Sequence, residues 1–194
     1  MKDSELAKKL ASSTPKEQTE LLKKFNFSDS LSLAEELKKL CYEAWLVHPE
    51  TTKRIVSAFQ LLKENSLEPE VKAFALWSSG IGEILEGRMR TAIEFFDKSQ
   101  AIFLSLNQAI AAAETQVGKL YALAVLGLYD EAVECGLNAR EIFLSKNEFY
   151  SAGKIEHNLG NIYLRRDRYD QAEHFFRIAR ERFDPKVDFQ KLIQ

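Results

Sequence analysis

The residues of this sequence best suited to catalysis or metal binding are its three histidines and two cysteines. We expect His157 and His174 at the solvated surface on opposite helices of one hairpin, without the carboxylate–histidine spacing of a metalloprotease site. His48 falls at a helix entry, where a structural or exposed position is expected. Cys41 and Cys135 lie far apart in helical patterns, which predicts buried thiols rather than a disulfide or a metal knuckle.

The glycines form no phosphate-binding loop. Gly80 and Gly82 lie inside a helical pattern and precede Glu83, whereas such a loop joins a strand to a helix. No Gly-x-Ser-x-Gly nucleophile motif occurs. Because an enzyme needs a nucleophile, base or metal held by its neighbours, we expect no enzyme, no cofactor and no metal.

The composition is that of an ordinary globular chain of 194 residues, 45% of them hydrophobic and 29% charged. Only 8 Gly and 4 Pro are present, which favours long helices. The formal charge of −2 supplies no positive field for nucleic acid or an acidic membrane. No apolar run has the length of a signal peptide or a membrane span, so we expect a cytoplasmic protein.

Helix starts can be read from several short motifs. Residues 14–17, Thr-Pro-Lys-Glu, form a capping box with proline at the first helical position. Ser32 opens a second such box, before a helix expected to run to about Val47. Pro49 and Pro69 are each expected to begin a new helix.

From residue 73 onward the sequence repeats itself with a fixed period of about 40 residues, which predicts stacked helical hairpins. One period superposes Gly87, Gly127 and Asp167; Ala92, Ala132 and Ala172; Ser99, Ala139 and Ala179; and Phe103, Phe143 and Phe183. The first set tolerates the left-handed backbone that ends a helix. The alanines and serine fall where two antiparallel helices approach closely, and the phenylalanines cover the base of the hairpin.

The last repeat carries the most specific motif, Leu159-Gly160 with Tyr163, followed by Tyr169, Ala172, Phe176 and Ala179. It resembles the Leu-Gly-x-x-Tyr … Tyr-x-x-Ala-x-x-x-Phe-x-x-Ala pattern of the tetratricopeptide repeat family. The resemblance covers about residues 33–185. It implies an all-α fold of antiparallel helix hairpins stacked in a right-handed superhelix.

The expected organisation has four parts. Residues 1–32 form a short helical cap, 33–68 a degenerate first hairpin, 69–185 three repeats, and 186–194 a capping helix or a continuation. The degenerate hairpin is aligned by matching Ala58 to Ala92 and Leu62 to Phe96, which is a shorter shift than the period of the later repeats.

The period of the three clear repeats is longer than the roughly 34 residues usual in the family. It is similar to that of N-terminal regulatory regions of larger signalling proteins, ahead of caspase-like peptidase or signalling-ATPase domains. The middle repeat departs in composition. Leu120 occupies the repeat position that Gly80 holds in the first repeat, and Gly136 occupies the position that Phe96 holds there. One interpretation is a volume-conserving exchange within the hairpin. The other is two unrelated changes that leave a shallow spot at Gly136.

In the family, the first helix of each hairpin lines the concave surface on which ligands lie. At these positions we expect a binding groove formed by Phe74, Trp77, Ile81, Val117, Tyr121, Lys154, His157 and Asn161. An apolar and aromatic groove suits an amphipathic helix or an apolar segment of a protein or peptide, or a second copy of the chain. The alternative for Phe74, Trp77 and Ile81 is burial between adjacent hairpins, and for Lys154 and Asn161 it is plain surface.

Three functions therefore remain open. The first is a scaffold that binds a partner segment in the groove. The second is a regulatory or sensory region whose groove holds another domain of the same polypeptide. The third is nucleic-acid binding by the C-terminal arginines, which the interleaved acidic residues make the weakest of the three because they predict ion pairs on solvated helix faces.

Overall fold

The computed structural model describes residues 2–183, which form ten α-helices and one 3₁₀ helix without any strand. The fold is thus all-α, as predicted. The chain divides into two compact units, residues 1–107 and 108–194. This boundary falls inside the segment 69–185 that the sequence groups as three repeats. The expected element at 186–194 lies outside the described residues.

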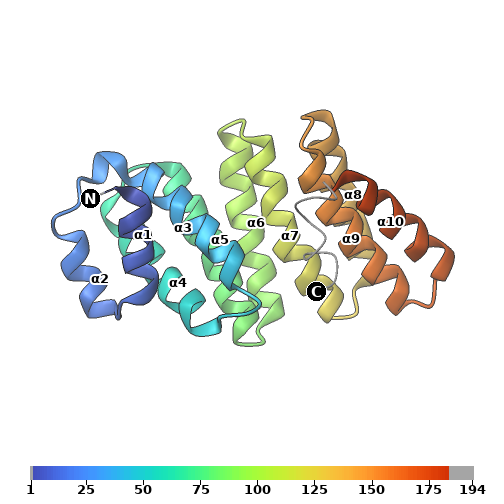
Figure 1. The fold of residues 1–194 in the computed structure, drawn as a ribbon, viewed down its shortest axis with the longest axis horizontal. Coiled ribbons are helices and arrows are strands. Elements are labelled where there is room, and N and C mark those ends of the chain that lie inside the picture. Colours follow the sequence, from blue (N-terminus) through green and yellow to red (C-terminus); the bar gives the residue numbers. More distant parts are fainter. Residues whose placement is uncertain (1, 184–194) are drawn as a thin grey trace. The chain divides into compact units, whose positions relative to one another are not determined.

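Unit 1 is a sequence of helices in which most neighbours along the chain pack together, and α2 packs on α1 and α4 (Figure 1). Its elements are α1 (Asp3–Ser12), α2 (Pro15–Leu22), η1 (Phe27–Asp29), α3 (Ser30–Ala44), α4 (Pro49–Asn65), α5 (Pro69–Leu85) and α6 (Met89–Ser105). Helix α3 also contacts α5, and α1 contacts α3 and α4. This pattern of neighbour and next-neighbour contacts is typical of helical repeats.

Unit 2 repeats the arrangement, with four helices within residues 108–183. They are α7 (Ala109–Val125), α8 (Tyr129–Ser145), α9 (Phe149–Arg165) and α10 (Tyr169–Arg182). Each packs on the next, and α7 also contacts α9. Helices α7 and α9 therefore lie side by side.

The helices from α4 to α10 begin at a constant interval, at positions 49, 69, 89, 109, 129, 149 and 169. The turns after α5 to α9 each contain one residue with positive φ, between 56° and 75°: Gly87, Asn107, Gly127, Asn147 and Asp167. The prediction for the two glycines and the aspartate is confirmed. The two asparagines extend the rule to the turns between repeats, since asparagine also tolerates this conformation.

The starts of the early helices agree with the sequence in most places. Glu17 accepts a hydrogen bond from the Thr14 backbone N–H at 2.7 Å, which confirms the first capping box. Pro15, Pro49 and Pro69 are each the first residue of a helix.

Two details of the early region are corrected. Helix α3 begins at Ser30 rather than after Ser32, because a 3₁₀ turn closed by the Asn26 side chain leads directly into it. Helix α4 begins at position 49 and α6 at position 89, which is the full period of the later repeats, so the shorter alignment of Ala58 with Ala92 is wrong. Thr52, fully buried, stands at the position of Ala92.

The interiors of the hairpins are filled as the repeat predicts. Ala92, Ala132 and Ala172 are at most 2% exposed. A Cβ placed on Gly80 would lie 2.6 Å from the Phe96 ring, and one on Gly136 would lie 2.7 Å from Cδ1 of Leu120. The large side chain has moved to the opposite helix in the middle repeat. The volume-conserving exchange is therefore confirmed.

Candidate functional site

Three of the predicted groove residues are buried inside unit 1. Phe74, Trp77 and Ile81 on α5 are 7%, 3% and 2% exposed. The Trp77 ring lies 5.0 Å from that of Tyr42 on α3 and 6.5 Å from that of Phe59 on α4. The expectation that these three side chains line an open groove is wrong, because the preceding hairpin packs against this face of α5.

A lysine completes the packing around this aromatic cluster. The ammonium of Lys38 lies 5.4 Å from the Phe74 ring centroid and 6.0 Å from that of Tyr42. Phe74 also meets the Phe103 ring edge to face at 5.1 Å. The Lys38 ammonium is attracted to the electron-rich faces of the two rings, and the alkyl chain of a lysine can cover apolar surface. These contacts hold the aromatic rings of unit 1 in a packed interior.

The remaining predicted residues lie on two adjacent helices of unit 2. Tyr121 on α7 is 36% exposed and Val117 is half-buried. On α9, Lys154 and Asn161 are exposed and His157 is half-buried. Because α7 contacts α9, the structure brings these five residues onto one pair of neighbouring helices. We call them the α7–α9 face.

Corresponding positions of the three repeats differ progressively in chemistry and exposure. At successive repeats Trp77 corresponds to Val117 and then His157, and Ile81 to Tyr121 and then Asn161. The α5 members are buried, whereas those on α7 and α9 are half-buried or exposed. Leu164, 46% exposed, adds an apolar side chain further along α9. The α7–α9 face thus combines apolar groups on α7 with mostly polar groups on α9.

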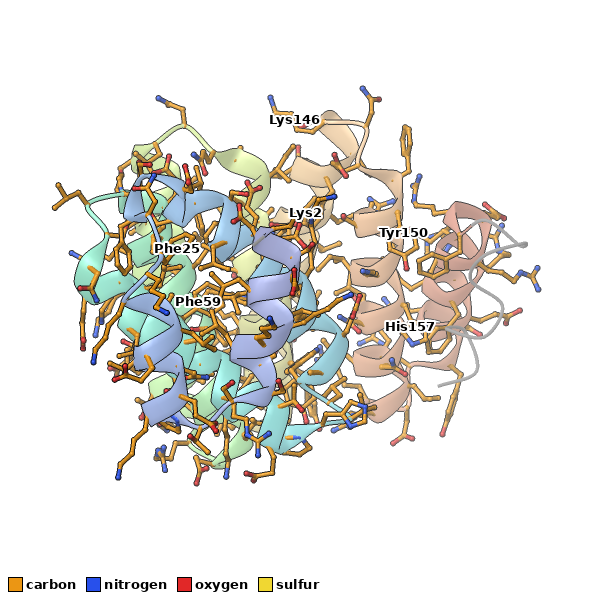
Figure 2. All side chains as sticks on the ribbon, turned by 60° about the vertical axis from the view of Figure 1, so that its left-hand side comes forward. Lys2, Phe25, Phe59, Lys146, Tyr150 and His157 are labelled. Carbon is orange, nitrogen blue, oxygen red and sulfur yellow. The ribbon has the colours of Figure 1, made fainter. Side chains whose placement is uncertain are left out.

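Two polar side chains of α9 contact aromatic rings. Figure 2 labels Tyr150 and His157, which both lie on this helix. The Lys154 ammonium lies 4.5 Å from the Tyr150 ring centroid, and the His157 ring lies 5.4 Å from that of Phe176 on α10. Partial burial lowers the pKa of His157, which favours the neutral imidazole. A neutral ring can donate one hydrogen bond and accept another. The expectation of a solvated His157 is corrected to a half-buried one.

A buried carboxylate on α9 is the main feature that the sequence analysis missed. Glu156 has no solvent exposure and accepts hydrogen bonds from Nε of Arg140 at 2.6 Å and Nε of Arg182 at 2.7 Å. The two arginines come from α8 and α10, so this ion pair joins three helices. Arg182 was expected on a solvated face. The repeat offered one signal for a buried polar group here, because Glu156 occupies the repeat position of Gln116, which is also polar. Both side chains are buried.

The two thiols are buried, as predicted. Cys135 donates to the side-chain oxygen of Gln116, and burial raises the pKa of Cys41 to about 12. A thiol with this pKa stays protonated at neutral pH and is a poor nucleophile.

Other candidate sites in the described part of the chain are weak. No group of three or more His, Cys, Asp or Glu side chains within residues 2–183 is placed to hold a metal ion. An open hollow of about 1140 Å³ lies against α1 and α2, lined by apolar residues and charges of both signs. None of the described helices is long and apolar enough to cross a membrane.

Comparisons with known proteins add no assignment to this geometry. A scan against protein-family models gives no match, and neither does a search of curated proteins.

Proposed function

We propose that this chain is a non-catalytic protein-binding scaffold of the tetratricopeptide kind, acting in the cytoplasm. Its partner is a protein or peptide that places an amphipathic helix or an apolar segment on the α7–α9 face. The proposal transfers the binding role from the α5 residues, which are buried, to the part of the predicted groove that remains accessible.

The observation that carries the proposal is the exposure of Tyr121 between a half-buried Val117 and the polar side chains of α9. Tyrosine offers a large apolar ring and a hydroxyl at little cost in side-chain entropy, and it is common among residues that dominate binding energy. A partner ring or aliphatic side chain packed on Tyr121 would leave its own polar groups within reach of Lys154 and Asn161.

The arrangement favours an amphipathic partner over a uniformly apolar one. Val117 and Tyr121 offer apolar area on α7, whereas Lys154, His157 and Asn161 offer a cation, an imidazole and an amide on α9. A helix with one apolar stripe and one polar flank matches both sides. This is the chemistry by which a partner segment would be recognised.

The first prediction tests this face with peptides selected from a displayed random library on the unaltered chain. Tyr121→Ala should weaken the binding of the selected peptides at least about tenfold, as expected for a central aromatic contact. Isothermal titration calorimetry with synthetic peptides measures the change, and circular dichroism checks that the fold is intact.

Leu137→Ala is the matched control. Leu137 is a comparably exposed apolar residue, at 41%, but it lies on α8 rather than on the α7–α9 face. Its replacement should leave the affinity unchanged. If the selected peptides bind Tyr121→Ala as tightly as the unaltered chain, the α7–α9 face is not the binding site.

A further inference from the structure

The charges that α9 exposes are both positive. The lysine, arginine and acidic side chains of this helix are Lys154, Glu156 and Arg165. Glu156 is fully buried and paired with two arginines, so its charge is matched inside unit 2. Lys154 and Arg165 are exposed and lie about 16 Å apart along the helix axis, at 1.5 Å per residue. Arg165 thus adds a second cation to the α9 side of the α7–α9 face.

The α7 side of the same face is apolar. Val117, Tyr121 and Val125 follow one another at steps of four residues, so they lie on one side of the helix. Val125 is 45% exposed, more than Tyr121. One repeat separates Val125 from Arg165, so these two residues hold the same position on adjacent helices. An apolar row on α7 therefore runs beside a row on α9 that has a cation at each end.

An ion pair holds the C-terminal ends of the two helices near each other. Nη1 of Arg166, which directly follows α9, lies 2.8 Å from Oδ1 of Asp130 at the start of α8. Asp130 follows the short turn after α7, so the contact joins the end of α9 to that turn. The Tyr169 hydroxyl donates a hydrogen bond to Asp167 at 2.8 Å. Both aspartates near Arg165 thus engage other side chains, and its exposed guanidinium can meet a partner.

We propose that the partner segment is an acidic amphipathic helix, which packs its apolar stripe along Val117, Tyr121 and Val125 and turns a flank of carboxylates toward α9. The identity of this segment rests on the proposed function, to which it adds charge and conformation. A helix fits because its own side chains three and four residues apart form rows that pack on another helix. A basic helix would bring like charges against α9, and a wholly apolar one would bury the Arg165 guanidinium without a partner.

A second copy of this chain matches the surface less well than a separate partner does. Helix α8 offers an acidic exposed side, with Glu134 and Glu141 on either side of Leu137. Leu137 is the one large apolar side chain that this helix exposes, against three apolar residues in the row on α7. The occupant is therefore a different protein, whose helix carries an apolar stripe as well as acids.

Selection from a displayed library of helical peptides tests the charge of the partner. The library fixes three leucines at helical spacing and randomises the flanking residues. Peptides selected on the unaltered chain should carry more Asp and Glu on one flank than the unselected library. Arg165→Glu should weaken their binding about fivefold or more by isothermal titration calorimetry, and lysine in place of the acidic flank residues should restore it.

Arg180→Glu is the matched control, because it makes the same charge change at an exposed arginine of α10. It should leave the affinity unchanged. Circular dichroism checks that both variants fold. If Arg165→Glu does not fold, Arg165→Gln replaces it and should weaken binding in the same direction by a smaller factor.

The outcomes separate a wrong charge from a wrong binding face. Peptides that depend on Tyr121 but have basic or uncharged flanks, or that bind Arg165→Glu as tightly as the unaltered chain, overturn the acidic helix and leave the scaffold in place. Peptides that bind independently of Tyr121 overturn the proposed function and the acidic helix together.

Two further outcomes assign the surface to another occupant and also overturn the acidic helix. One is self-association in sedimentation experiments that Arg165→Glu and Glu134→Lys each abolish, which shows that a second copy binds there. The other is displacement of the peptides by a single-stranded oligonucleotide, lost in Arg165→Glu, which shows that a nucleic acid is bound instead.

Discussion

Glu156 links three helices of unit 2 through its ion pairs with Arg140 and Arg182. A carboxylate without solvent exposure is stable only when it is paired and hydrogen-bonded, and here two guanidinium groups from two other helices supply the partners. Their side chains are 28% and 24% exposed, so each arginine also reaches solvent. The carboxylate therefore carries the larger part of the desolvation cost.

The second prediction follows from this pairing. Glu156→Gln removes the charge that holds Arg140 and Arg182, and should destabilise unit 2 by about 3 kcal/mol, the lower end for breaking a buried ion pair. Urea denaturation followed by circular dichroism measures the loss. Glu173→Gln, an exposed acid on α10, should change stability by less than about 0.5 kcal/mol. Equal stability of the two variants would show that the buried pair contributes nothing.

Single residues also show which parts of the site could be predicted. Leu120 and Gly136 were paired from the sequence because each departs from its repeat position, and an internal repeat supplies the reference. Trp77 was predicted to line an open groove and is instead buried, because the sequence of its own repeat does not show what packs against this side chain. Tyr42 and Phe59, which bury it, come from the preceding hairpin, whose repeat pattern is weak.

At the scale of helices, the sequence predicted most of the architecture. Proline at the first position marks three helix starts, and the repeat period marks six helices from α5 to α10. The weak first hairpin was misaligned because, within residues 2–183, no glycine or asparagine with positive φ precedes α4. Local turn chemistry was therefore the most reliable guide to element boundaries.

The third prediction concerns two glycines whose backbones differ. Gly127 has a φ of +75° with open space around it, so Gly127→Ala should destabilise by about 1 kcal/mol through backbone strain alone. Gly82 lies within α5, where a Cβ would meet Val56 at an ordinary 3.5 Å. Gly82→Ala should therefore stabilise by about 0.5–1 kcal/mol. Thermal denaturation measures both, and the same sign for both variants would contradict the turn geometry.

At the scale of the whole chain, the two compact units carry different spectroscopic probes. Both tryptophans, Trp45 and Trp77, belong to unit 1, and Glu156 belongs to unit 2. Tryptophan fluorescence therefore reports on unit 1, whereas far-ultraviolet circular dichroism reports on the helices of both units. A variant that destabilises unit 2 alone should therefore shift part of the circular dichroism transition without shifting the fluorescence transition.

The fourth prediction is that the two units unfold as separate cooperative steps. Glu156→Gln should move part of the circular dichroism transition to lower urea concentration and leave the fluorescence midpoint unchanged. Glu173→Gln should change neither signal. A fluorescence midpoint that shifts together with the circular dichroism would show that the chain unfolds as one cooperative unit.

The helix spacing has a consequence for how such a chain can change length. Since the helices from α4 to α10 start at a constant interval, inserting or deleting one pair of helices with its turns keeps every later residue at its original position in the repeat. Inserting or deleting a single helix with its turn would instead shift every later residue by half a repeat, so that residues suited to the first helix of a hairpin would fall in the second. The turns at Gly87, Asn107, Gly127, Asn147 and Asp167 are therefore natural recombination points, at which hairpins can be duplicated, removed or grafted without redesigning the helices themselves.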